Sequence, residues 1–197
     1  MRVAIFTGSA SGDRPVFAER AASLARALAE QGIGITYGGG DVGLMGVVAR
    51  EALASGGEVI GVMPRALVER ELAHSGLTRL EVVESMHDRK ARMAELSDAF
   101  IALPGGSGTL EEFFEAWTWQ QLGIHDKPVA LYSIDGFWGP LIAAIDAGVD
   151  GGFLRATYRD ALIVSENAED LLHQLKAWKP APRKWHKTGA ASEVPRP

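Results

Sequence analysis

Short apolar runs alternate along the chain with longer segments in which apolar residues recur every three or four positions. The runs are almost continuously apolar, which is typical of parallel strands that are buried on both faces. The longer segments have the periodicity of amphipathic helices, and in the first of them the apolar stripe is Phe17, Ala21, Leu24 and Leu28. The alternation predicts an α/β fold, a Rossmann-like three-layer sandwich with a central parallel sheet.

The predicted elements follow one another without an internal repeat or a linker, so residues 1–178 form a single predicted domain. The predicted strands are Val3–Thr7, Gly34–Tyr37, Glu58–Met63, Leu80–Val83, Ala99–Leu103, Val129–Tyr132 and Leu162–Val164. The predicted helices are Val16–Gln31, Gly43–Ser55, His87–Leu96, Gly108–Leu122, Phe137–Ala147 and Ala168–Trp178. Residues 179–197 contain four prolines and five basic residues, and we expect them to form a C-terminal extension outside the domain.

Composition limits the classes of function. The 197 residues carry a net charge of −5, which argues against nucleic acid as the main partner. The absence of cysteine excludes disulfides, thiolate catalysis and cysteine metal sites. The sequence has no signal-peptide pattern and no apolar run long enough to span a membrane, so we expect a cytoplasmic protein without a membrane partner.

Three glycine-bearing turns follow predicted strands, at Gly8–Gly12, Gly38–Gly46 and Pro104–Glu112. The carboxyl ends of parallel strands lie at one edge of the sheet, where ligands bind in open α/β folds, so we expect these turns to line one pocket. The middle turn contains G-x-G-x-x-G. The next strand does not end in the acidic residue that binds a dinucleotide ribose, so a nucleotide pocket is favoured over NAD binding.

The turn Pro104–Glu112 runs from a predicted strand into a predicted helix. Its glycines allow a ligand to approach the backbone, and the free N–H groups of a helix start bind phosphate. Thr109 adds a hydroxyl group, and Glu112 adds a carboxylate one turn into the helix. This combination predicts an enzyme that acts on a sugar phosphate or nucleotide. The alternative is a tight turn that only packs the helix on the strand.

Two basic residues, Arg89 and Lys90, open the predicted helix after the fourth strand, at the same sheet edge. The position favours a clamp for phosphate or carboxylate over a solvated surface, because a guanidinium binds either group with two hydrogen bonds. The histidines have no spacing typical of a metal site, and no metal is predicted. The aromatic residues Phe113, Phe114 and Trp117 suit either the core or a partner interface.

Three motifs occur together in this chain. Residues Pro104–Glu112 read P-G-G-x-G-T-x-x-E, Met86–Lys90 read M-H-x-R-K, and Gly38–Gly46 read G-G-G-x-x-G-L-M-G. In these motifs the chain resembles the LOG (Lonely guy) family of cytokinin riboside 5′-monophosphate phosphoribohydrolases, over roughly residues 2–175. Relatives are often labelled lysine decarboxylase-like. That chemistry needs a Schiff-base lysine, and only Lys90 and Lys127 precede Lys176.

The resemblance implies hydrolysis of the N-glycosidic bond of a purine riboside 5′-monophosphate, which releases the free base and ribose 5-phosphate and needs no cofactor. It implies that Arg89 and Glu112 are catalytic. It also implies a homodimer with the pocket near the subunit contact, for which we expect helix faces near Trp117, Trp119 and Phe137. The substrate-binding positions that it implies, together with those that we add from the glycine turns, are Ser9, Gly39, Gly40, Glu71, Arg89, Lys90, Gly105, Gly106, Ser107, Gly108, Thr109, Leu110, Glu111, Glu112 and Thr118.

Cleavage of a glycosidic bond passes through a positively charged, oxocarbenium-like state at C1′. We assign stabilisation of that charge to the Glu112 carboxylate. Arg89 then orients Glu112 or neutralises phosphate, because a guanidinium does not give up its proton. The proton for the leaving base has three candidate sources, Asp88, Glu71 and water. Two other functions stay open: an AMP or GMP nucleosidase for nucleotide recycling, and a nucleotide-binding carrier without turnover.

Overall fold

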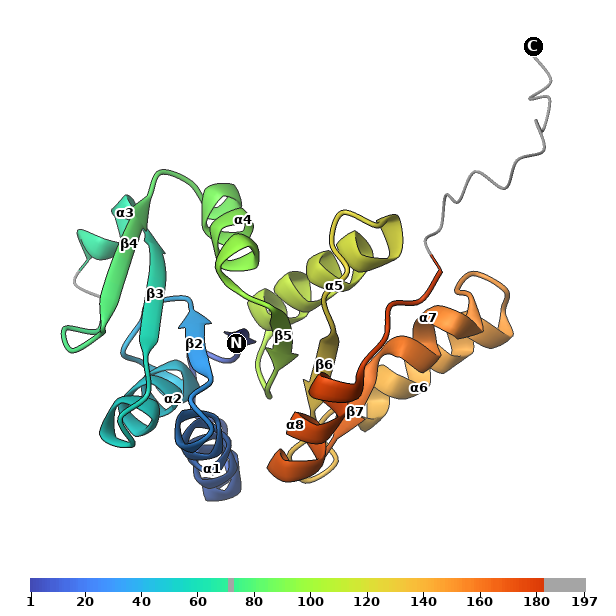
Figure 1. Ribbon diagram of the computed structural model, residues 1–197, viewed down its shortest axis with the longest axis horizontal. Helices are drawn as coiled ribbons and strands as arrows, with labels where there is room; N and C mark the ends of the chain where they lie inside the picture. Colours follow the sequence, from blue (N-terminus) through green and yellow to red (C-terminus); the bar gives the residue numbers. More distant parts are fainter. Residues whose placement is uncertain (71–72, 183–197) are drawn as a thin grey trace, which may run out of the picture.

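The computed structural model describes residues 1–70 and 73–182, which fold around one central sheet (Figure 1). The sheet has seven parallel strands in the order β4-β3-β2-β1-β5-β6-β7. The strands are β1 (Arg2–Phe6), β2 (Gly34–Tyr37), β3 (Val59–Pro64), β4 (Arg79–Val83), β5 (Ala99–Ala102), β6 (Val129–Tyr132) and β7 (Ile163–Ser165). The predicted α/β fold with a parallel sheet is confirmed, and every predicted strand is present.

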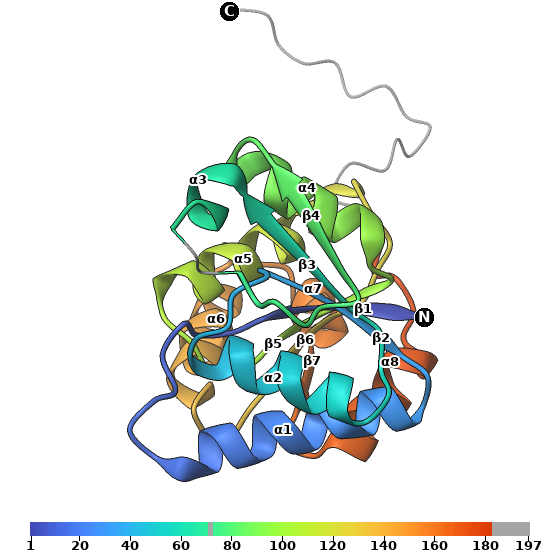
Figure 2. The ribbon, with the colours of Figure 1, turned by 90° about the vertical axis from the view of Figure 1, so that its left-hand side faces the viewer.

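Helices cover both faces of this sheet and complete three layers (Figures 1 and 2). One face carries α1 (Pro15–Glu30), α2 (Gly43–Ala54) and α8 (Ala168–Ala177). The other face carries α4 (Met86–Leu96), α5 (Ser107–Leu122), α6 (Gly139–Asp150) and α7 (Ala156–Ala161). The sequence analysis missed α7 and also α3 (Arg65–Val68), because helices of six and four residues are too short to show a periodicity. No helix within the described ranges has the length and apolarity needed to span a membrane.

Alternate side chains of each strand point to opposite faces of the sheet and enter two separate cores. In β1, Val3 and Ile5 pack against α1, α2 and α8, whereas Ala4 and Phe6 pack against the helices of the other face. All four side chains are buried. Because both faces need apolar residues, the strands appear in the sequence as continuous apolar runs.

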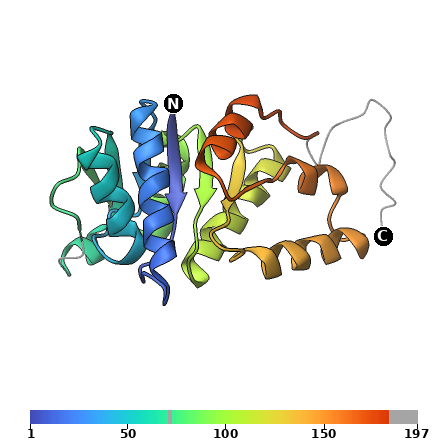
Figure 3. The ribbon, with the colours of Figure 1, turned by 90° about the horizontal axis from the view of Figure 1, so that it is seen from below.

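The strand order reverses at β1. The chain adds β2, β3 and β4 on one side of β1 and then returns to place β5, β6 and β7 on the other. The two halves lie on either side of the sheet centre, blue to teal in the first and yellow to red in the second (Figure 3). Because α1 and α5 leave β1 and β5 toward opposite faces, a crevice forms at the carboxyl edge between the helices that follow these strands.

His125 is a half-buried histidine between α5 and β6. Its Nδ1 accepts a hydrogen bond from the Lys127 backbone N–H at 3.2 Å, and its Nε2 donates to the Ala116 carbonyl oxygen at 3.0 Å. The imidazole also packs on Phe100, with 5.0 Å between ring centroids. The neutral ring thus uses both nitrogens, and burial lowers the pKa of His125.

We expect acid to destabilise the protein through His125. In the unfolded chain this histidine takes up a proton near its ordinary pKa of about 6.5, whereas the folded state holds it neutral to lower pH. The free energy of unfolding should therefore fall as the pH drops below about 6.5, and the fall should be smaller in His125→Gln. Urea unfolding at about pH 7.5 and about pH 5.5 measures both changes. Equal changes in the two proteins would show that His125 is not the cause.

Candidate active site

A cavity of about 250 Å³ opens at the carboxyl edge of the sheet, at the crevice between β1 and β5. It is formed by β1, by the loops after β1, β2 and β5, and by the N-terminal parts of α2, α4 and α5. Its lining residues are Ile5, Thr7, Gly8, Ser9, Gly38, Met45, Arg89, Gly106, Ser107, Gly108, Thr109 and Glu112. The structure therefore brings together the predicted catalytic pair Arg89 and Glu112 with the core of the predicted phosphate cradle.

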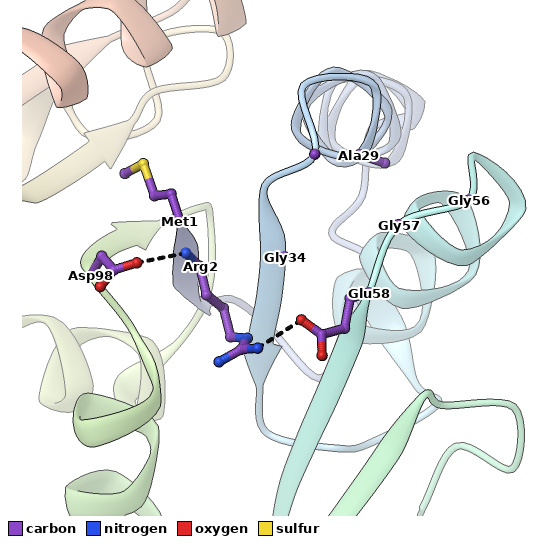
Figure 4. Close-up of a pocket in the computed structure, with 9 residues that line it drawn as sticks. Met1, Arg2, Ala29, Gly34, Gly56, Gly57, Glu58 and Asp98 are labelled. Carbon is purple, nitrogen blue, oxygen red and sulfur yellow. Dashed lines mark hydrogen bonds and ion pairs between the residues drawn. The ribbon is translucent and has the colours of Figure 1, made fainter.

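A larger hollow of about 440 Å³ lies at the opposite, amino edge of the sheet (Figure 4). Two of its contacts join lining residues to one another: Arg2 Nη2 donates to Glu58 Oε2 at 2.7 Å, and the Arg2 backbone N–H donates to Asp98 Oδ2 at 2.8 Å. Open α/β sheets bind ligands at the carboxyl edge of their strands. Position and chemistry therefore both favour the smaller cavity as the active site.

The three glycine turns interlock beneath the cavity. The Gly8 backbone N–H donates to the Pro104 carbonyl oxygen at 3.1 Å, which ties the first turn to the third. A Cβ on Gly105 would lie 2.1 Å from Thr109 Oγ1 and 2.8 Å from the Gly8 backbone nitrogen. A Cβ on Gly43, where φ is +54°, would lie 2.3 Å from the Ser9 carbonyl carbon. The backbones approach so closely that only glycine fits at these points.

The first turn of α5 is open to an anion. Gly106 is its N-cap residue and provides no side chain to bond the backbone N–H groups that begin the helix. Gly106, Ser107 and Gly108 are exposed, while the buried Thr109 also lines the cavity. Unpaired N–H groups and the positive end of the helix dipole together suit a phosphate group.

Arg89 and Glu112 meet across the cavity from different helices. Arg89 Nη1 lies 3.6 Å from Glu112 Oε1, and the two side chains are only 12% and 11% exposed. Arg89 Nε also donates to the Val62 carbonyl oxygen at 3.2 Å, near the end of β3. Burial raises the pKa of Glu112, and the Arg89 charge acts in the opposite direction. The Arg89 guanidinium therefore favours the charged form of the mostly buried Glu112 carboxylate.

Asp88 has a structural role in this arrangement. Its carboxylate accepts hydrogen bonds from the Ser85 hydroxyl at 2.7 Å and from the Ser85 backbone N–H at 3.1 Å. The Ser85 hydroxyl in turn accepts from the Asp88 backbone N–H, which completes a capping box at the start of α4. Asp88 does not line the cavity, so its position does not support the proton-donor hypothesis.

Several predicted substrate residues lie outside the cavity of the single chain. Lys90 pairs with Glu111 and lies 3.0 Å from Glu115, so its ammonium group joins α4 to α5. Gly39 packs on Met63 and Leu80. The other predicted residues that do not line it are Gly40, Gly105, Leu110, Glu111 and Thr118. Glu71 lies outside the described residues, as does the predicted extension beyond residue 182.

The cavity also contains residues that were not among the predicted substrate-binding positions, although three of them lie in the glycine turns that we expected to line a pocket. Thr7 and Gly8 directly follow β1, Gly38 directly follows β2, and Met45 lies in the first turn of α2. For Gly8 and Gly38 the available signal was their place at the start of a glycine turn after a predicted strand. For Met45 the available signal was its place in the motif Gly38–Gly46.

The two lysines that precede Lys176 do not fit a Schiff-base role. The Lys90 ammonium is held by two carboxylates, and Lys127 Nζ donates to the Ala94 carbonyl oxygen at 2.6 Å. Neither lysine lines the cavity with Arg89 and Glu112. Among the described residues, no group of three or more His, Cys, Asp or Glu side chains is arranged to hold a metal.

Comparison with known proteins gives the family. Residues 45–175 match the family model described as "Possible lysine decarboxylase". A rice (Oryza sativa subsp. japonica) protein named probable cytokinin riboside 5′-monophosphate phosphoribohydrolase LOGL1 is 46% identical over 177 residues, covering 90% of this chain and 79% of the relative. The Arabidopsis thaliana phosphoribohydrolase LOG5 is 45% identical, covering 91% and 78%. The chain belongs to the LOG family.

Solved structures extend the likeness of this LOG-family chain at the level of the fold. A molybdenum cofactor binding protein from Rippkaea orientalis superposes with a TM-score of 0.68 at 21% identity, covering 89% of this chain and 95% of the other. The molybdenum cofactor carrier protein of Chlamydomonas reinhardtii superposes with a TM-score of 0.66 at 20% identity, covering 89% and 97%. At such identities the likeness concerns the fold alone.

The close packing of the three turns predicts that one methyl group added at Gly105 strongly lowers the stability of the fold. We expect Gly105→Ala to lower the free energy of unfolding by about 2–4 kcal/mol, because the new Cβ overlaps Thr109 and the backbone of Gly8. Gly139→Ala, at the start of α6, is the matched control, since its Cβ meets no atom within 4 Å. It should change stability by less than about 0.5 kcal/mol. Denaturant unfolding of both variants checks this, and similar losses would contradict the interlock.

Proposed function

We propose that this chain hydrolyses the N-glycosidic bond of purine riboside 5′-monophosphates, with cytokinin riboside 5′-monophosphates as the preferred substrates. The main support is one observation: an open helix N-terminus and the Arg89–Glu112 pair share a single cavity. The names of the rice and Arabidopsis relatives describe the same reaction. The products are the free base and ribose 5-phosphate. A cytoplasmic location, predicted from the sequence, belongs to the same proposal.

In this proposal the start of α5 binds the 5′-phosphate. Gly106, Ser107, Gly108 and Thr109 hold the phosphate through backbone N–H groups and a hydroxyl, and this fixes the attached ribose. Glu112 lies one helical turn farther along, beside the ribose. Its carboxylate stabilises the positive charge that develops at C1′ as the bond to the base breaks.

Arg89 keeps Glu112 in its charged form. A carboxylate that is mostly buried is pushed toward its neutral form, and the nearby guanidinium opposes that tendency. The guanidinium does not supply a proton to the leaving base. With Asp88 engaged in the helix cap, Glu71 and water are the remaining candidates for that step.

The Arg89–Glu112 pair also argues against a carrier without turnover. A carboxylate beside a phosphate-binding helix start repels an anionic ligand, so a protein that only binds nucleotides gains nothing from burying it there. A charge that is unfavourable for ground-state binding becomes useful when a cation forms in the transition state. The position of Glu112 therefore favours catalysis.

Replacing Glu112 by glutamine tests the catalytic proposal. We expect Glu112→Gln to slow release of the base by about a hundredfold or more, because the side chain keeps its shape and loses its charge. Nucleotide binding, measured by calorimetry, should remain. Glu30→Gln, at the exposed end of α1, is the control and should leave the rate unchanged. Turnover of Glu112→Gln within about threefold of wild type would contradict the assignment.

The pH profile gives an independent check on the same residue. The active form carries an ionised Glu112, and burial raises its pKa, so activity should fall as the pH drops through a value above the ordinary one for glutamate, about 4.3. Measuring kcat/KM against pH locates this acidic limb. A limb at or below the ordinary value would contradict the buried, ionised carboxylate.

The choice of base separates cytokinin activation from nucleotide recycling. Side-by-side kcat/KM values for isopentenyl-AMP, AMP and GMP make the comparison with one preparation of enzyme. The proposal expects isopentenyl-AMP to be preferred by about tenfold or more, the discrimination that a few buried methyl groups provide. Preference for AMP or GMP would support the general nucleosidase instead.

We also propose that the protein is a homodimer that uses the outer face of α5. Residues Leu110, Phe114, Thr118 and Leu122 follow one another at four-residue spacing and form one stripe along this helix. Phe114 and Leu122 are each 40% exposed. Trp117, by contrast, is only 3% exposed and belongs to the core, so the proposed interface excludes this residue, which the sequence-based prediction had included.

A dimer through this stripe would explain how Thr118 and Leu110, which do not line the cavity of the single chain, can lie near a substrate. Thr118 lies about 16 Å along α5 from Ser107, too far to reach a phosphate bound at the start of its own helix. In a dimer joined through this face, Thr118 of each copy can approach the substrate of the other.

The variant Phe114→Lys tests this dimer. It places a charge on the proposed interface, so it should be a monomer by light scattering and should lose most base release. Val82→Lys, on β4, is the control. A monomeric wild type would contradict the proposal.

A further inference from the structure

The guanidinium of Arg89 occupies the space that a side chain at position 38 would fill. Gly38 directly follows β2 and is buried. A Cβ on Gly38 would lie 1.8 Å from Arg89 Nη2 and 3.0 Å from Arg89 Cζ. The distance to Nη2 is far below any van der Waals contact, so the guanidinium in this position and a side chain at position 38 exclude each other.

The backbone of Gly38 does not itself require glycine. Gly38 is absent from the residues with positive φ, whereas its neighbour Gly39 has a φ of +82°. The atoms that a Cβ on Gly38 would approach belong to the end of one flexible side chain. A substitution at position 38 would therefore move that side chain and leave the backbone in place.

The remaining contacts of Arg89 show how the empty space beside Gly38 helps to hold the guanidinium in place. Its Nε donates to the Val62 carbonyl oxygen at 3.2 Å, and its Nη1 lies 3.6 Å from Glu112 Oε1. The first contact fixes one side of the guanidinium and the second directs it at the carboxylate. Gly38 supplies the third side, where Nη2 lies against the backbone of the loop after β2.

We propose that Gly38 is a positioning residue whose missing side chain holds the guanidinium of Arg89 beside Glu112. This inference rests on the proposed function and adds to it a residue that acts only through another. A methyl group at position 38 pushes the guanidinium away from the loop and out of its place next to the carboxylate. Such a variant keeps the fold, but the positive charge of Arg89 no longer lies next to the Glu112 carboxylate.

The groups around Glu112 make this displacement measurable. Arg89 and Lys90 face it from α4, and Glu111 and Glu115 accompany it on α5. Lys90 is held by Glu111 and Glu115, so Arg89 is the cation that responds to a change at position 38. Moving the Arg89 charge away removes the influence that opposes burial, and the pKa of Glu112 should rise further.

The first experiment compares Gly38→Ala with wild type and with the control Gly139→Ala. Glu112 is titrated by ¹³C NMR on glutamate-labelled protein, with Glu112→Gln assigning its signal, and base release from AMP is followed in parallel. We expect Gly38→Ala to unfold within a few degrees of wild type, to lose about tenfold or more in kcat/KM, and to titrate Glu112 at higher pH. An unchanged titration midpoint would overturn the inference. If wild type releases no base, the proposed function fails, and the titration still decides the role of Gly38.

A double-mutant cycle with Arg89→Ala excludes a purely structural effect. Once the guanidinium is gone, Gly38→Ala should change neither the rate nor the Glu112 titration any further. If Gly38→Ala alone does not fold, adding Arg89→Ala should restore folding, because it removes the clash. Additive effects, or a failure to restore folding, would overturn the inference.

Discussion

The site depends on how closely three backbone turns approach one another at the carboxyl edge of the sheet. The turns after β1, β2 and β5 leave no room for a Cβ at Gly43 or Gly105, and a hydrogen bond from Gly8 to Pro104 ties two of them together. This packing places the start of α5 at the crevice where the strand order reverses. The proposed phosphate cradle and the proposed catalytic pair, Arg89 and Glu112, depend on that placement.

The two ends of the cavity favour ligand groups of opposite charge. The open N-terminus of α5 attracts a negative group, and the buried Glu112 is suited to a positive one. A nucleoside monophosphate undergoing glycosidic cleavage presents both, a phosphate at one end of the ribose and a developing cation at C1′. Arg89 makes the arrangement possible, because an unpaired carboxylate in this site would tend to be neutral.

The sequence predicted the strands well because a sheet covered on both faces requires continuous apolar runs, as in Val3 to Phe6. The short helices α3 and α7 carry too few residues to show a period. Motifs located Arg89, Glu112 and the phosphate cradle, but they did not indicate which side of a helix faces the cavity. Two predicted substrate residues, Lys90 and Glu111, bind each other in the structure. A third, Thr118, lies on the outer face of α5. The role of Gly38 was not predictable, since its partner Arg89 is distant in the sequence and meets it only in the folded chain.

The central claim is that phosphate binding at α5 positions the ribose for chemistry at Glu112. Comparing kcat/KM for AMP and adenosine tests it most directly, because the two substrates differ only in the group that the helix start binds. If the binding energy of the phosphate is used to position C1′, AMP should be preferred by about a hundredfold or more. Equal kcat/KM values for the two substrates would contradict this account of the site.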